Sequence, residues 1–480
     1  MTGAETDPPS RMGPVLFFRG YTGGGIALAV LAATPCGTPA PQLETRDGTV
    51  TAEPLAAAVD RQLWRYRFTL PATRDAAYRF DGEAFAVSAC LDHDLRIAFV
   101  SCNGREHGDA ERDPRERNVL WRHLADANDA RPVQLLLNGG DQLYADEMLD
   151  VHPLVREWRD DGDIAEPDAD TMAVITERLR AALFTRYLAL YAQDGPARVT
   201  ARVPSLCIWD DHDICDGWGS LYPHQLDAAI GRAVFGVARE AYLLFQHACA
   251  PDEVPPLCPD RSGISLSWCA RLPDLAVMAP DLRSERRPDR VMGPAGHAVL
   301  ADAAAASDEA RVLVLSSVPV LGPRLSWVEG AMRLIPHAQK YEDDLRDQWQ
   351  SRAHRDEWRH FLRTMLTMHE RPRTRVTLLS GEIHLATRGA MYGARDAMHQ
   401  LVASGIAHPP PPRAYARGLG LLAMLGESPL PVRPVRLHPL PGQRTVYTAQ
   451  RNYLMLERRH NRWRAWWELE RDGPTPALAL

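Results

Sequence analysis

The stretch VQLLLNGGDQLY, residues 133–144, joins an aliphatic run to a polar turn. Continuous aliphatic runs of this length are typical of parallel strands that are buried on both faces. Ligands of α/β sheets bind beyond the carboxyl ends of the strands, which is where Asp141 and Tyr144 fall in this stretch. We therefore predict a buried strand at residues 133–137 with a functional site immediately after it.

Three more segments place residue types that bind metals directly after an apolar run. They are Ser101-Cys102 after residues 96–100, Asp210-Asp211-His212-Asp213 after residues 205–208, and Ser380-Gly381-Glu382-Ile383-His384 after residues 376–379. Since ligand sites form beyond the carboxyl ends of strands, the four segments are predicted to converge. Together they predict one polynuclear metal site, which no single segment predicts with the same specificity.

From residue 95 onward, strands alternate with helical stretches, a pattern typical of an α/β sheet covered by helices. Predicted helices span residues 116–129, 171–191, 227–249 and part of 342–369, and further strands span residues 275–279, 311–316, 445–457 and 463–471. The proline-rich residues 407–442 are predicted to form an exposed, lid-like surface loop.

Residues 1–94 have the character of an all-β region. Strand-like runs at residues 15–18, 26–33, 63–70 and 77–89 are separated by clusters of Gly, Pro, Asp and Thr. We therefore predict two domains, an N-terminal β-sandwich-like domain at residues 1–94 and a catalytic α/β domain at residues 95–480.

Charge and composition narrow the class of protein. The net charge of −7 over 480 residues argues against nucleic-acid binding, which requires a basic patch. The longest apolar run, residues 26–33, is too short to span a bilayer. The eight cysteines lack a repeated CxxC spacing and are expected to be mostly buried, reduced thiols, with Cys102 as the exception. We expect a cytoplasmic location, with secretion as the less favoured alternative.

Asp141 and Tyr144 suit a site with more than one cation. A carboxylate at a strand end can bridge two ions, and a phenolate three residues later can reach one of them. Phenolate is a hard anionic ligand and favours a trivalent ion such as iron. The alternative interpretation is a capping aspartate followed by a packed tyrosine.

The segment at residues 209–213 gathers three carboxylates around one imidazole, a density that is costly unless cations neutralise it. Asp211 is predicted to bind a second metal ion, and Asp216 is a candidate further ligand. His212 is placed to donate a proton to a leaving oxygen, with Asp210 or Asp213 orienting it. A salt-bridged surface turn is the alternative.

The remaining candidates are weaker individually. Glu382 and His384 alternate in an extended segment, so both can face one site. Arg283 either faces an anionic substrate or forms a structural pair with Asp281. His399 and His408 are expected to be solvated histidines.

In order and context, the four segments resemble the PhoD-like (alkaline phosphatase D) branch of the calcineurin-type metallophosphatases over about residues 95–405. The resemblance implies a metallophosphatase-like αββα sandwich. It also implies a dinuclear or larger metal centre, with a ferric-type ion and a calcium ion or another divalent ion such as zinc or manganese. The implied ligands of the first ion are Cys102, Asp141, Tyr144 and His384. Those of the second are Asp141, Asp211 and Glu382, with His212 near the leaving group and Asp210, Asp216 and Arg283 as candidate additional contacts.

The function expected from this resemblance is hydrolysis of phosphate esters, by a phosphatase or phosphodiesterase whose metal centre activates a hydroxide. The substrate would be a small phosphate ester or a phosphodiester, including a phospholipid diester. The chain departs from the family pattern at Glu382, which replaces Asp, and at Asp213, which replaces Glu. The first departure keeps a second hypothesis open. In that hypothesis the chain is a non-catalytic phosphate-ligand binder or scaffold that retains the fold.

Overall fold

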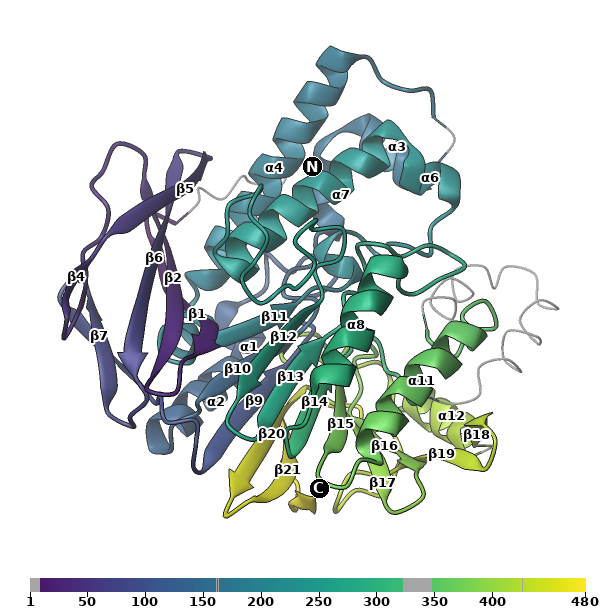
Figure 1. The fold of residues 1–480 in the computed structure, drawn as a ribbon. Helices are drawn as coiled ribbons and strands as arrows, with labels where there is room; N and C mark the ends of the chain where they lie inside the picture. The colour runs from purple at the N-terminus through teal and green to yellow at the C-terminus, as the bar shows by residue number, and fades with distance from the viewer. Residues whose placement is uncertain (1–8, 161, 163, 323–347, 425) are drawn as a thin grey trace.

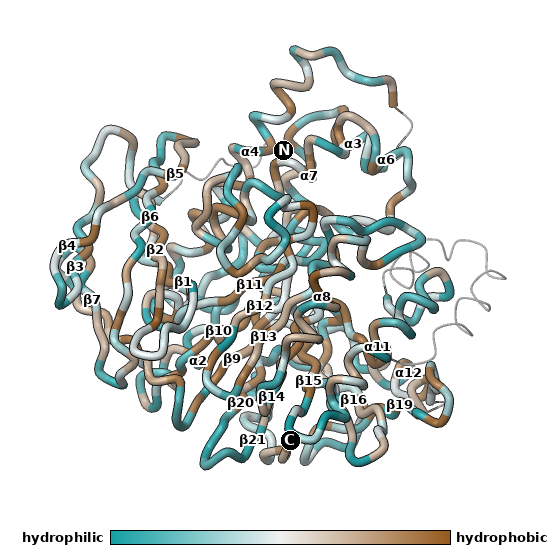
Figure 2. Tube along the Cα trace, in the orientation of Figure 1, coloured by the Kyte–Doolittle hydropathy of each residue, from teal (hydrophilic) through white to brown (hydrophobic). Residues whose placement is uncertain are grey.

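Figure 1 shows the fold in a computed structural model, which describes residues 9–160, 162, 164–322, 348–424 and 426–480. Two mixed sheets pack face to face, and helices cover their outer faces. Ile97 and Leu137 of the first sheet and Val277 and Leu379 of the second belong to one apolar core between the sheets. Figure 2 shows the hydrophobic residues concentrated along these central strands. The predicted α/β class and αββα layering are confirmed.

The first sheet runs through the N-terminal, central and C-terminal parts of the chain. Its strands, in spatial order, are β22 (Gly473–Pro474), β21 (Arg462–Leu469), β20 (Asn452–Arg459), β9 (Leu95–Val100), β10 (Leu135–Gly139), β11 (Ser205–Ile208), β1 (Met12–Tyr21), β2 (Gly25–Pro35), β6 (Arg61–Pro71) and β5 (Ala52–Ala58), with β23 (Leu478–Ala479) beside β21.

The second sheet is formed by the C-terminal half of the chain, and a small third sheet lies near the N-terminus. The second sheet has the order β12 (Trp268–Leu272), β13 (Leu275–Ala279), β14 (Arg311–Leu315), β15 (Arg375–Ser380), β17 (Ala397–Val402), β16 (Thr387–Tyr392), β19 (Arg433–His438) and β18 (Glu427–Leu430). The third has the order β4 (Gly48–Val50), β3 (Leu43–Thr45), β7 (Ala76–Phe80) and β8 (Glu83–Val87).

Helices bury apolar faces against the outer sides of both large sheets. Trp121 of α2 packs with Val100 of β9, Phe361 of α11 packs with Val376 of β15, and Tyr187 of α4 lies in a core shared with Phe17 of β1. The helices are α1 (Pro114–Arg117), α2 (Val119–Ala130), α3 (Pro153–Asp160), α4 (Ala169–Tyr191), α5 (Asp194–Thr200), α6 (Pro223–Asp227), α7 (Ala229–Ala241), α8 (Pro294–Ala306), α11 (Arg355–His369) and α12 (Arg413–Ala423), with short helical turns η1 (Asp146–Val151), η2 (Asp211–Asp213) and η3 (Tyr242–Gln246).

The four motif-bearing strands divide between the two large sheets. β9, β10 and β11 are parallel neighbours in the first sheet, and β15 lies parallel to β14 and β17 in the second. The two edges meet where Gly381 lies against Ser101, so closely that a Cβ on Gly381 would be 2.3 Å from Ser101 Oγ. Glycine is required at this contact because any side chain would separate the sheets.

The N-terminal β-rich region is present, and it is joined to the first sheet. β1 pairs in parallel with β11 through Phe17 and Ser205, and β2, β6 and β5 continue the same sheet. The small third sheet packs against this extension, where Tyr78 contacts Phe68 with ring centroids 5.6 Å apart. Because one sheet runs across residue 94, the domain boundary placed there stays a prediction.

Several element predictions need correction. Residues 407–442 do not form a surface loop, since they contain α12, β18 and β19, and β19 pairs with β16 in the second sheet. Their prolines misled the prediction because Pro412 is the N-cap of α12 and Pro434 lies near the start of β19, positions that tolerate proline. The helix expected at residues 227–249 corresponds to α7 and the π-turn η3, which together span residues 229–246, and α11 begins only at Arg355. Residues 342–347 of the last predicted helix lie outside the described residues.

Within the described residues, no helix combines the length and the apolar character needed to cross a bilayer.

Candidate metal centre

The turns that follow the motif strands adopt unusual backbone conformations at the predicted site residues. Cys102, Asp141, Glu382 and His384 have φ values of 53°, 55°, 64° and 53°. Left-handed conformations in residues other than glycine cost about 1 kcal/mol or more each and cluster at functional sites. The strain of these left-handed conformations is therefore tolerated at the four residues whose side chains are predicted to form the site.

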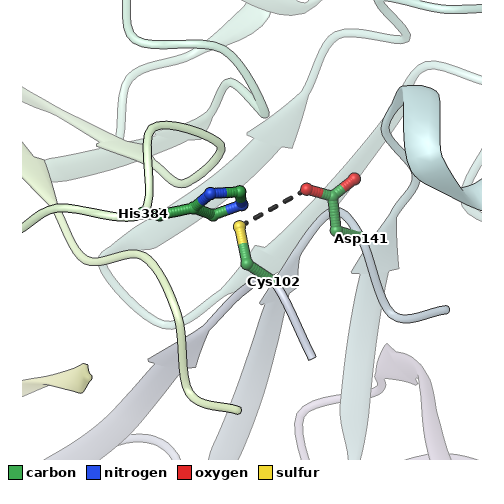
Figure 3. A group of neighbouring side chains, drawn as sticks. All are labelled: Cys102, Asp141 and His384. Atoms are coloured by element: carbon green, nitrogen blue, oxygen red, sulfur yellow. Dashed lines mark hydrogen bonds between the residues drawn. The ribbon is translucent and has the colours of Figure 1, made fainter. Parts of the chain in front are cut away.

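Cys102, Asp141 and His384 come together from three separated parts of the chain (Figure 3). Their ligand atoms lie within 4.8 Å of one another, and the thiol of Cys102 lies 3.4 Å from Asp141 Oδ2. Tyr144 adds a phenol oxygen, which lies 2.9 Å from His384 Nε2 and 3.5 Å from Asp141 Oδ2. The structure thus brings together all four residues predicted to bind the first ion.

The surroundings of Asp141 fit a cation. Its carboxylate is buried, and within the described part of the chain its Oδ1 has no hydrogen-bond partner. Burial and the neighbouring carboxylate of Asp210 raise the pKa of Asp141 well above its usual range. A buried carboxylate in this position is costly unless a cation neutralises it, so the donor set fits a metal ion.

Asp141 also belongs to a second group of potential ligands, with Asp210 and Asp211, and Asp211 forms a third group with His212 and Asp216. The second group is partly neutralised by Arg283, which is fully buried. Its Nη2 lies 2.5 Å from Asp210 Oδ1 and 3.2 Å from Asp211 Oδ1.

Arg283 therefore acts as a counter-ion inside the site. The structural pair predicted with Asp281 is wrong for the guanidinium, because Asp281 instead accepts a hydrogen bond from the backbone amide of Arg283 at 3.0 Å. A direct contact between Arg283 and substrate stays a prediction.

His212 is held by a carboxylate that the sequence did not single out. Its Nδ1 lies 2.8 Å from Asp146 Oδ2, and its ring stacks on Tyr144 with centroids 4.3 Å apart. Burial lowers the pKa of His212, but Asp146 and Asp211 outweigh burial and raise it well above the usual value. The orienting partner is thus Asp146 and not Asp210 or Asp213. The sequence offered one signal for this role, since Asp146 is a second carboxylate two residues after Tyr144.

Asp213 has a structural task. Its carboxylate accepts hydrogen bonds from the backbone amides of Asp141 at 2.9 Å, Leu143 at 3.1 Å and Asp210 at 3.0 Å, and from the side chain of Gln246 at 3.0 Å. Burial raises the pKa of Asp213 to about 7. Through these hydrogen bonds, Asp213 connects the turn after β11 to the turn after β10.

Two histidines expected to be solvated are not. His408 is 9% exposed, and its ring stacks on His384 with centroids 3.4 Å apart. His408 Nε2 lies 3.2 Å from both carboxylate oxygens of Glu106, and these two residues form a fourth group of potential ligands with His384. His399 lies half-buried in β17, where burial and Arg388 lower its pKa to about 4. Sequence reasoning missed Glu106, which is 278 positions before His384 and has no motif around it.

Glu382 lies outside the four groups found among the described residues. Its Oε1 accepts a hydrogen bond from Gln348 Nε2 at 2.8 Å. Its assignment as a metal ligand stays a prediction.

A family model described as PhoD-related phosphatase matches residues 64–342, more than half of the chain. The chain belongs to the PhoD-related phosphatase family. The match includes Cys102, Asp141, Tyr144 and Asp211, whereas Glu382 and His384 lie beyond it. This result confirms the resemblance that the motifs indicated.

The solved structure of PhoD agrees on the fold. The structure of PhoD matches with a TM-score of 0.59 at 10% identity, covering 100% of this chain and 90% of PhoD. At that identity the likeness shows the fold alone. A dimetal phosphatase from Danio rerio gives a TM-score of 0.32 at 10% identity over 80% of this chain and 98% of that one, which is too low a score to show a shared fold.

Among curated proteins, an uncharacterised protein of Saccharomyces cerevisiae is 23% identical over 399 residues, which is 70% of this chain and 55% of the yeast protein. The PhoD-related chain therefore spans about half the length of the curated relative it matches.

Proposed function

We propose that this PhoD-related protein hydrolyses phosphate esters, as a phosphatase or phosphodiesterase, at a dinuclear or larger metal centre. The observation that carries the proposal is the shared position of Asp141. It belongs both to the group with Cys102 and His384 and to the group with Asp210 and Asp211. A carboxylate common to two donor groups is the arrangement expected of a ligand that bridges two ions.

For the first ion we propose the donors Cys102, Asp141, Tyr144 and His384. Burial raises the pKa values of Cys102 and Tyr144 well above their usual ranges, so both groups are neutral without a cation. Binding of a metal ion is then coupled to the release of protons. The phenolate favours a ferric-type ion.

For the second ion we propose Asp141 and Asp211, with Asp216, Asp210 and Glu382 as further candidates. These hard oxygen donors suit calcium or another divalent ion, with zinc and manganese as alternatives. Arg283 already contributes positive charge at this position, so we expect the second ion to be bound more weakly than the first.

Bound ions would supply an activated hydroxide and neutralise the phosphoryl oxygens. His212 would donate a proton to the leaving oxygen. Its hydrogen bond to Asp146 and its stacking on Tyr144 fix the ring orientation that this role needs. The substrate would be a small phosphate monoester or a phosphodiester.

Elemental analysis together with kinetics tests this proposal. Purified protein that is stripped by chelation and reloaded with iron and calcium is expected to regain turnover of an aryl phosphate or a bis-aryl phosphate. The Asp141→Ala variant is expected to lose both metal and turnover, whereas the exposed control Asp150→Ala keeps them. Equal turnover in Asp141→Ala would contradict the proposal.

The second hypothesis, a non-catalytic phosphate-ligand binder, is favoured by the neutralisation of Asp210 and Asp211 by Arg283. Less than one tightly bound metal ion per chain, with phosphate binding and no turnover, would support it. A cytoplasmic location also stays a proposal, which fractionation of cells that express the full chain tests.

A further inference from the structure

A cavity of about 290 Å³ lies in the N-terminal part of the first sheet, apart from the metal centre. It is formed by β1, β2 and β6 together with the segment that follows η3. Its lining residues are Arg19, Ala27, Leu28, Arg65, Arg67, Phe68, Thr69, Cys249, Glu253 and Pro256. None of them belongs to the groups of potential metal ligands.

Arg19 is the unusual residue of this cavity. Its Nη2 is buried and has no hydrogen-bond partner among the described residues. Its guanidinium carbon lies 5.6 Å from the centroid of the Phe17 ring. The residue as a whole is partly buried. Charges removed from water in folded proteins are normally paired, because a charge without a counter-ion is unfavourable there. Burial lowers the pKa of Arg19, and the nearby charge of Glu253 offsets only part of this effect.

The carboxylates near the cavity are occupied by the other two arginines. Glu253 lies 2.5 Å from Arg65 Nη1, and Glu53 lies 2.8 Å from Arg65 Nη2 and 2.9 Å from Arg67 Nη2. Three guanidinium groups therefore face two carboxylates. The surplus positive charge is that of Arg19.

We propose that this cavity binds a small organic anion. Its anionic head would accept hydrogen bonds from Arg19, and its short apolar body would lie against Leu28, Phe68 and Pro256. A guanidinium offers a planar fork of donors that matches a carboxylate or phosphate head. An anion there would neutralise the surplus charge without displacing an existing ion pair.

The cavity shares a segment with the metal centre. Arg65 Nη1 donates to the carbonyl oxygen of Ala248 at 3.1 Å, and Gln246, two residues earlier, donates to Asp213 at 3.0 Å. Asp213 in turn accepts from the Asp141 amide. An anion in the cavity would thus lie next to the segment at residues 246–248, which is connected to Asp141 through Asp213.

Calorimetric titration of the full chain with sodium hexanoate tests the proposal. Hexanoate is expected to bind saturably at one site, and hexan-1-ol, which keeps the apolar body without the charge, is expected not to bind. Arg19→Met is expected to weaken hexanoate binding at least tenfold. The matched control Arg46→Met, at an exposed arginine, is expected to bind like the unsubstituted protein.

Two further variants separate the possible binding sites. Asp141→Ala is expected to retain hexanoate binding, because hexanoate would bind in the cavity and not at the metal centre. Thr69→Trp, which fills the cavity and leaves Arg19 in place, is expected to abolish binding even if Arg19→Met does not fold. Unchanged binding in Arg19→Met or Thr69→Trp, loss of binding in Asp141→Ala, or equal binding of hexan-1-ol would each overturn the proposal. These binding measurements do not depend on hydrolysis, so they can fail or succeed independently of the proposed function.

Discussion

The carboxylate of Asp213 accepts a hydrogen bond from the backbone amide of Asp141 at 2.9 Å, so the turn after β11 fixes the turn after β10. Asp141 sits there at a φ of 55°, a conformation that needs support from its surroundings. The dense carboxylates of residues 210–213 therefore serve different purposes. Asp213 supports the turn, whereas Asp211 contacts Arg283 and stays a proposed metal ligand.

Replacing Asp213 by Asn is expected to destabilise the protein by about 2–4 kcal/mol, because one acceptor oxygen becomes a donor that faces backbone N–H groups. Urea denaturation measures the change in the free energy of unfolding. The control Asp150→Asn, at an exposed position, is expected to change it by less than about 0.5 kcal/mol. Equal stability of the two variants would show that the amides do not depend on the charge of Asp213.

Replacing Asp146 by Asn is expected to lower kcat about 10–100-fold while metal content stays unchanged, since residues that orient a functional imidazole contribute at this scale. Steady-state kinetics with an aryl phosphate and elemental analysis of the same sample measure both quantities. If the metal content instead falls together with kcat, Asp146 is needed to maintain the metal centre and not only to orient His212. Asp150→Asn again serves as the control.

Replacing Tyr144 by Phe removes the phenol oxygen and keeps the ring that stacks on His212. If Tyr144 binds a ferric ion, the visible charge-transfer band of the iron-loaded protein is expected to disappear. Tyr447→Phe, at a buried tyrosine in an apolar cluster with Leu385 and Ala416, is expected to keep the band. An absorption spectrum distinguishes the two outcomes, and a band that survives in Tyr144→Phe would exclude the phenolate ligand.

Acidification is expected to destabilise the protein through His247. Burial, followed by the charge of Arg19, lowers its pKa to about 3 in the folded state. The unfolded chain takes up the proton below about pH 6.5, so stability is lost as the pH falls from about 6.5 towards 3, by about 1.4 kcal/mol per pH unit from this group. Urea denaturation at several pH values is expected to show a shallower loss in His247→Leu. The exposed control His224→Leu should retain the full slope, and identical slopes would contradict this assignment.

Replacing Gly140 by Ala is expected to destabilise the protein by about 2 kcal/mol or more. Gly140 has a φ of 104°, and a Cβ would lie 2.7 Å from Asp210 Cβ. Gly236→Ala, in α7 with no atom within 4 Å of the added methyl group, should instead stabilise the protein by about 0.5–1 kcal/mol. Thermal unfolding measures both changes, and a neutral Gly140→Ala would show that the turn can relax.

The sequence predicted the parts of the fold that depend on local patterns. β11 matches the predicted strand at residues 205–208, and β9, β10 and β15 differ from their predictions by one or two residues at the ends. Apolar runs that are buried on both faces carry a strong signal, and polar residues directly after them mark the carboxyl ends of strands. The surface loop predicted at the proline-rich residues 407–442 was wrong, because proline also fits the cap of α12 and the start of β19.

The order of polar residues after apolar runs was enough to determine which strands carry the candidate site and which family the chain belongs to. Only the tertiary structure decided the partners. Arg283 pairs with Asp210 across 73 positions, His408 stacks on His384, and β1 joins the N-terminal strands to β11. The reason is physical: local patterns fix which backbone segments are buried, whereas the pairing of charges and rings depends on side-chain directions that exist only once distant strands have packed together.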